Sequence, residues 1–179
     1  AAEATWQALR GHLPRFGGVE LTLGDLDLAA LENGFFSLRH APGTTLVPAE
    51  LQLSWRTSRR KVFRGSEAAL RPASQRLVHF VSPHPVERGS AVSLDWEPVG
   101  SVHACLFSHL LGAHVGLLHL QERVAHPGLF LHAQTVGSRA TLATCSVPWL
   151  HNRSLNVNPR ESRYVARDER VFPAIVPDA

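Results

Sequence analysis

Short runs with the alternation of a β-strand, each closed by glycine or proline, recur along most of this chain. The clearest region is 126–155, where Leu129 and Leu131 alternate with Phe130 and His132, the period of a strand with contacts on both faces. A second run, 139–147, is rich in β-forming residues, and Pro148 ends it because proline has no N–H to give to a ladder. These runs predict two neighbouring strands joined by a turn at 137–138.

The same pattern predicts further strands elsewhere. Residues 110–118 also fit a helical stripe, but Gly112 and Gly116 argue against a stable helix. Short helical segments are expected at 2–10 and 65–75. The predicted strands are a hairpin at 19–28, then 35–38, 50–55, 76–81, 91–96, 102–107 and 115–120. Many short strands with little helix predict an all-β fold, an antiparallel β-sandwich of jelly-roll type.

At 179 residues with 44% hydrophobic content, the chain is expected to form a single β-sandwich domain over 1–179. It carries an N-terminal arm (1–18) and an extended C-terminal tail (156–179). The net charge of +3 is too small for a dedicated nucleic-acid binder. No run approaches the length of a membrane span, and the N-terminus lacks the pattern of a signal peptide.

Cys105 and Cys145 both fall inside predicted strands. Two interpretations remain open: buried free thiols that act as small hydrophobes, or a disulfide between neighbouring strands. No zinc-type cysteine spacing is present.

A single basic cluster lies in the segment RTSRRKVFR. One interpretation is a solvated hairpin tip that protects a sheet edge. The other is a contact site for RNA phosphates. The candidate RNA-binding residues are Arg56, Arg59, Arg60, Lys61 and Arg64.

Motifs for catalysis and cofactor binding are absent from the sequence. No GxSxG elbow, HExxH motif or GxxxxGK[ST] phosphate loop occurs. Histidines recur every five to seven residues from His103 to His132, but their spacing indicates polar positions on a sheet more than a metal site. We therefore expect no enzymatic activity, no cofactor and no metal.

The runs HPGLF and SVPWLHNRS, preceded by GSVHACLF and GLLHLQE, resemble picornavirus-like capsid proteins, above all those of nepoviruses and comoviruses. The resemblance covers about 100–155. It implies a structural subunit of an icosahedral RNA-virus capsid, found in the virion and in host cytoplasm during assembly. The implied partners are other capsid subunits, with weak contact to genomic RNA and no membrane.

Apolar residues in short terminal segments, and the element after the last predicted strand, are the candidate subunit interface. An alternative from another class is a stand-alone β-sandwich module that binds a small apolar or carbohydrate ligand. Its candidate contacts, Trp55, Trp96 and Trp149, are equally interpretable as core. The candidate interface residues are Trp6, Leu9, Pro148, Trp149, Leu150, His151, Phe172, Ile175 and Val176.

Overall fold

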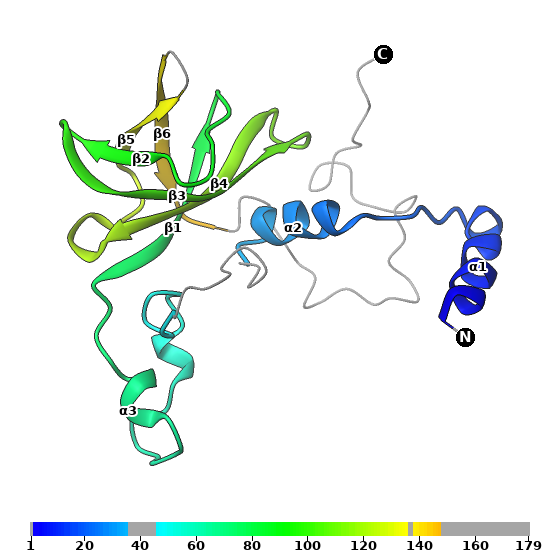
Figure 1. Ribbon diagram of the computed structural model, residues 1–179, viewed down its shortest axis with the longest axis horizontal. Helices are drawn as coiled ribbons and strands as arrows, with labels where there is room; N and C mark the ends of the chain where they lie inside the picture. Colours follow the sequence, from blue (N-terminus) through cyan, green and yellow to red (C-terminus); the bar gives the residue numbers. More distant parts are fainter. Residues whose placement is uncertain (1, 36–45, 136–137, 148–179) are drawn as a thin grey trace, which may run out of the picture.

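Six antiparallel strands close into one barrel in the computed structural model, which describes residues 2–35, 46–135 and 138–147 (Figure 1). Around the barrel the order is β1-β4-β3-β2-β5-β6, and β1 closes on β6. The strands are β1 (Gln75–Ser82), β2 (Ala91–Leu94), β3 (Glu97–Ser108), β4 (Ala113–Gln121), β5 (Phe130–Thr135) and β6 (Ser138–Cys145).

The predicted antiparallel β fold with short helices is confirmed, whereas a two-sheet jelly roll is not. The long strand β3 pairs with β2 on one side and β4 on the other, with register shifts after Val92 in β2 and after Val102 in β3. Such bulges bend and twist a sheet, which helps it to close on itself. Because strands alternate in the same way in sandwiches and barrels, local pattern does not separate the two.

Alternate residues of each strand fill the barrel. In β1, Val78 and Phe80 belong to the interior core, while Leu77 packs in a second cluster on the outer surface. Gly116 in β4 lies against Phe80: a Cβ at this position would be 2.0 Å from the carbonyl oxygen of Ala104 and 2.6 Å from the Phe80 ring. Only glycine therefore fits where β3, β4 and this ring meet.

Residues 19–28 do not form the predicted hairpin, because a helix, α2 (Leu23–Glu32), begins there. Thr22 and Asp25 form a capping box: Asp25 N–H donates to Thr22 Oγ1 at 3.2 Å, and Thr22 N–H donates to the Asp25 carboxylate at 2.7 Å. Hydrogen bonds from Thr22 lower the pKa of Asp25. Residues 19–28 also alternate as a strand does, but the capping box of Thr22 and Asp25 starts a helix there.

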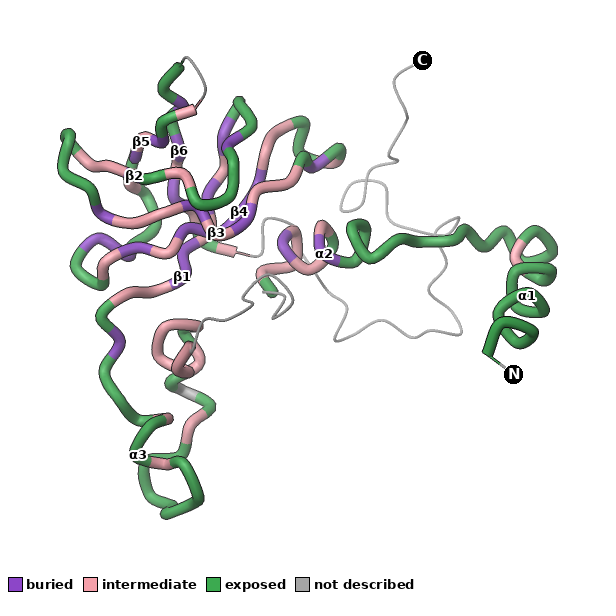
Figure 2. Tube along the Cα trace, viewed as in Figure 1, coloured by how far each residue is buried: buried purple, intermediate pink, exposed green. Residues whose placement is uncertain are grey.

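The second hydrophobic cluster holds α2 against the outside of the barrel. Leu31 of α2 packs with Leu77, Val115 and Leu117, which point outward from β1 and β4. Figure 2 shows buried residues on the strands and on part of α2, while the segment before α2 is exposed except at Leu13. The helix therefore packs against the barrel through Leu31, while its side chains Leu23 and Leu26 stay exposed.

The remaining elements are short. The predicted N-terminal helix is confirmed as α1 (Ala2–His12), followed by η1 (Pro14–Phe16). The strand predicted at 50–55 is wrong, since turns and η3 (Ser54–Arg56) occupy it. A short helix, α3 (Ser66–Ala69), lies within the predicted 65–75 segment, and η4 (Glu122–Val124) follows β4.

Trp96 occupies a different position from the one expected. The predicted strand 91–96 includes it, but it lies with Asp95 in the tight turn between β2 and β3. Both turn residues have positive φ, 46° and 73°, as a two-residue hairpin turn requires. The Trp96 ring is 81% exposed and carries the Arg139 guanidinium 4.2 Å above it, so it belongs to the surface.

Candidate functional site

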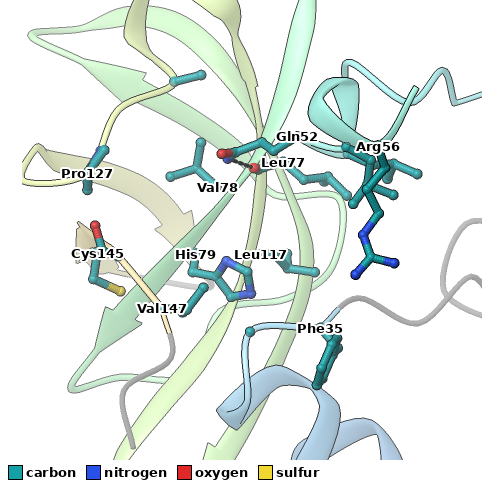
Figure 3. Close-up of a pocket in the computed structure, with 15 residues that line it drawn as sticks. Phe35, Gln52, Arg56, Leu77, Val78, His79, Leu117, Pro127, Cys145 and Val147 are labelled. Carbon is teal, nitrogen blue, oxygen red and sulfur yellow. Dashed lines mark hydrogen bonds between the residues drawn. The ribbon is translucent and has the colours of Figure 1, made fainter. Parts of the chain in front are cut away.

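A cavity of about 720 Å³ lies between the outside of the barrel and the segments that cover it (Figure 3). We call it the outer pocket. Strands β1, β4 and β6 form one wall, and residues 34–35 and 51–56 form the other. Its lining residues are Gly34, Phe35, Leu51, Gln52, Leu53, Arg56, Leu77, Val78, His79, Leu117, Ala125, Pro127, Cys145, Ser146 and Val147.

His79 is the titratable residue at the centre of the barrel wall of this pocket. In the strand register it stands opposite Leu117 of β4 on one side and Cys145 of β6 on the other. Burial beside such neighbours disfavours the charged imidazolium and lowers the pKa of His79 to about 4. The imidazole is therefore neutral at physiological pH and offers both a donor and an acceptor nitrogen.

The covering segment is tied to β1 by hydrogen bonds. Gln52 Nε2 donates to the carbonyl oxygen of Leu77 at 2.7 Å, and the N–H of Leu77 donates to the carbonyl oxygen of Glu50 at 2.8 Å. Gln52 has a φ of 57°, which is uncommon for a residue with a side chain. Backbone of this kind often occurs at binding sites, and Gln52 lines the outer pocket.

Two groups of different chemistry face the barrel wall. Figure 3 shows the Arg56 guanidinium and the Phe35 ring on the side of the pocket opposite His79. Phe35 lies three residues after the end of α2, and its N–H donates to the carbonyl oxygen of Ala30 at 2.8 Å, so the packing of that helix on the barrel also places this residue. The pocket thus combines apolar walls and an aromatic ring with one permanent positive charge.

The two cysteines are not joined by a disulfide, so the disulfide interpretation is wrong. Their strands, β3 and β6, are not neighbours in the barrel. Both side chains are half-buried, and burial raises the pKa of Cys105. Only Cys145 lines the outer pocket.

The candidate RNA-binding residues do not form one site. Arg56 lines the outer pocket, Arg59 lines a second cavity, and the other three are exposed on the segment that follows. The expected hairpin tip is not formed, because turns and η3 replace the strand predicted at 50–55. Whether these residues contact RNA stays a prediction.

Of the candidate interface residues, Trp6 and Leu9 lie exposed on α1. The other seven lie outside the described residues, as does the tail that carries the last three. Histidines are dispersed around the barrel, and the described part of the chain has no group of three possible metal ligands. Nor does it contain a helix long and apolar enough to span a bilayer.

Sequence reasoning missed His79, Gln52 and Phe35 as pocket residues. The signal for His79 was present: it is the one titratable residue inside the apolar run LVHFV. Its neighbours across the sheet are Leu117 and Cys145, which are distant in sequence, so no local pattern shows that they lie beside it. Gln52 and Phe35 lie in segments that were interpreted as strands.

No protein-family model and no curated protein matches this chain. Among solved structures it is similar to the glycine cleavage system aminomethyltransferase T from Bartonella henselae. The match has a TM-score of 0.71 and 20% sequence identity, and it covers 82% of this chain and 44% of that one. The chain therefore spans less than half the length of the protein whose fold it shares.

This likeness overturns the resemblance to capsid proteins. The fold that the chain shares with a solved structure is that of an aminomethyltransferase, over most of its length. A closed barrel also replaces the jelly roll that capsid function implied. The alternation and the Val-Pro-Trp element at 147–149 are compatible with many β folds, so they did not identify one. The interpretation as a capsid subunit is wrong.

Proposed function

We propose that this chain is the barrel-bearing part of an aminomethyltransferase-like protein, and that it holds a ligand without performing the bond-making step. The observation that carries the proposal is the outer pocket itself, formed where α2 and residues 46–56 pack against the barrel. The shared fold supports the relationship to an aminomethyltransferase. The match covers only 44% of the aminomethyltransferase, which supports a role for this chain beside a further folded part.

The lining of the pocket indicates what kind of molecule it takes. Leucines of the covering segment and of the barrel, with the Phe35 ring, suit a flat apolar body. Arg56 suits an acidic group at one end, because a guanidinium binds carboxylates and related anions in fork geometry. Neutral His79 adds a hydrogen-bonding group without charge. We infer an amphipathic acid with a planar apolar part.

The same residues are poorly suited to catalysis at neutral pH. A general base works best when its pKa is near the working pH, and that of His79 is about 4. A neutral imidazole also does not supply the positive charge that activates a neighbouring thiol such as Cys145. The proposed role of these groups is to orient and enclose the ligand.

The N-terminal segment supports attachment to a further folded part. Large apolar side chains remain exposed along α1, η1 and α2, and leaving them in water is unfavourable. We propose that the rest of the aminomethyltransferase-like protein covers them. This surface includes the two candidate interface residues of α1. The exposed residues are Trp6, Leu9, Phe16, Val19, Leu21, Leu23 and Leu26.

The ligand proposal is tested with 8-anilinonaphthalene-1-sulfonate, a planar aromatic anion with the inferred chemistry. Because Cys145 lines the pocket, bound probe should slow its alkylation by iodoacetamide, while alkylation of Cys105 serves as an internal reference. Replacing Arg56 with Gln should remove that protection. The control variant Arg15→Gln also removes one positive charge, but on η1, and this variant should retain the protection of Cys145.

Two results would overturn the proposal. One is equal alkylation of Cys145 with and without the probe, which would mean that the probe binds elsewhere. The other is full protection in Arg56→Gln, which would mean that the anionic group is not recognised by this pocket. Tryptic peptide masses distinguish the two cysteines without any further substitution.

A further inference from the structure

Positive charge is concentrated in one segment of the chain, residues 54–76, which we call the basic arm. It carries seven Lys or Arg residues against the single carboxylate of Glu67. The whole chain has a net charge of +3, so an arm with six net positive charges leaves three net negative charges on the remainder. Figure 1 shows this arm, with α3, extending away from the barrel.

A second cavity, of about 240 Å³, lies where the arm joins β1. We call it the arginine pocket, because Arg59, Arg71 and Arg76 all line it. Ser54 and Thr57 add hydroxyl-bearing side chains to its wall, and Glu122 supplies its one carboxylate. Three guanidinium groups around one small cavity repel one another unless an anion lies between them.

The existing contacts leave part of this charge without a partner. Arg76 pairs through Nη2 with Glu122 Oε1, but its buried Nε has no hydrogen-bond acceptor among the described residues. Among the residues that the structure describes, neither Arg59 nor Arg71 forms an ion pair. A buried donor without an acceptor is costly, so an acceptor supplied from outside the chain is expected at this position.

We propose that the arginine pocket binds the phosphate group of a phosphoester. Guanidinium forks match the oxygen pairs of a phosphate, and several of them can share one dianion. Arg76 holds the inner oxygens through Nε, while the more exposed Arg59 and Arg71 close over the outer ones. The cavity is larger than a phosphate alone, which leaves room for the group esterified to it.

The phosphate has two possible sources, a free phosphomonoester or the backbone of a nucleic acid. The arm distinguishes them, because Arg60, Lys61 and Arg64 lie exposed beyond the pocket. A small phosphomonoester held in the pocket has no need of these residues. A single-stranded RNA chain would also contact them, and each phosphate contact adds about 0.7 to the slope of log affinity against log salt.

The test uses the full chain with two probes. Phenyl phosphate is titrated by calorimetry at constant ionic strength, and a short fluorescein-labelled single-stranded RNA is titrated by anisotropy across a range of salt. The double variant Arg59→Gln, Arg71→Gln should weaken binding of either probe by about tenfold or more, since it removes two charge-assisted contacts. Both side chains are exposed, so the fold should survive.

Two controls separate the pocket from general charge. Arg15→Gln changes the same charge far from the arm and should leave both affinities unchanged. The triple variant Arg60→Gln, Lys61→Gln, Arg64→Gln should spare phenyl phosphate. If it also lowers the salt slope for RNA, the physiological source is a nucleic-acid backbone, and if RNA does not bind, the source is a phosphomonoester.

The proposal is overturned by either of two outcomes. RNA binding that depends on Arg60, Lys61 and Arg64 but is unchanged in Arg59→Gln, Arg71→Gln would show a diffuse basic surface with no phosphate pocket. Equal heats for phenyl phosphate and for phenol would show that the phosphate is not recognised. Neither outcome bears on the outer pocket, which is tested separately with a sulfonate.

Discussion

Ser108, fully buried at the end of β3, donates a 2.6 Å hydrogen bond to Oε1 of Glu32 at the end of α2. The same hydroxyl oxygen accepts a hydrogen bond from the N–H of Leu111 at 3.1 Å. The bond joins the covering helix to the barrel across 76 positions of sequence. It thereby fixes the end of α2 from which Phe35 enters the outer pocket.

Replacing Ser108 with Ala should loosen α2 from the barrel. The change leaves the Glu32 carboxylate without its buried donor, which costs about 1–3 kcal/mol of unfolding free energy. Hydrogen exchange of the amides in α2 should accelerate more than exchange in β4. The exposed Ser74→Ala is the matched control, and equal exchange in both variants would show that the helix is held by apolar packing alone.

The two faces of α2 should respond differently to the same substitution. Leu31 is 4% exposed and packs against the barrel, so Leu31→Ser should lower the unfolding free energy by about 2–5 kcal/mol. Leu26 is 53% exposed, and Leu26→Ser should change the unfolding free energy by less than about 0.5 kcal/mol. Urea denaturation of the two variants measures this contrast. A large loss in Leu26→Ser would mean that this face is covered within the chain itself.

Gly116→Ala should be among the most destabilising single changes in the barrel. The added Cβ would meet the Ala104 carbonyl and the Phe80 ring at distances that real side chains do not show. Gly11→Ala in α1 is the control, because open space surrounds that position and alanine favours a helix by about 1 kcal/mol. Thermal unfolding should show a large drop for the first variant and no drop for the second.

The low pKa of His79 predicts a defined dependence of stability on pH. In the unfolded chain this imidazole titrates near its ordinary value of 6.5, but in the fold burial lowers the pKa to about 4. The contribution of neutral His79 is complete above pH 6.5 and is lost as the pH falls from there toward 4. The loss amounts to at most about 3 kcal/mol.

His79→Leu should flatten the pH dependence of the unfolding free energy over that interval. Leucine has no proton to gain, and it suits the apolar neighbours at this position. The exposed His84→Leu should keep the slope of the unchanged protein. Denaturant titrations at several pH values supply the measurement, and an unaltered slope in His79→Leu would assign the titration to another group.

Local pattern was sufficient for most of the barrel strands. The runs at 76–81, 115–120 and 139–147 lie within or overlap β1, β4 and β6, because alternation and turn residues act over a few positions. The helix α1 was likewise predicted from its own residues. Errors arose where the pattern was ambiguous: 19–28 alternates as a strand does, yet a capping box of Thr22 and Asp25 starts α2 there.

Only the tertiary structure decided how the strands close and what the outer surface of the barrel carries. Residue alternation says which side chains share a face, but it does not say which strand lies beside which. The register of β1 against β6 places His79 beside Cys145, and the arm brings Arg59 and Arg71 to Arg76. Both candidate sites join residues far apart in sequence, so their chemistry follows from packing between segments that no local signal relates.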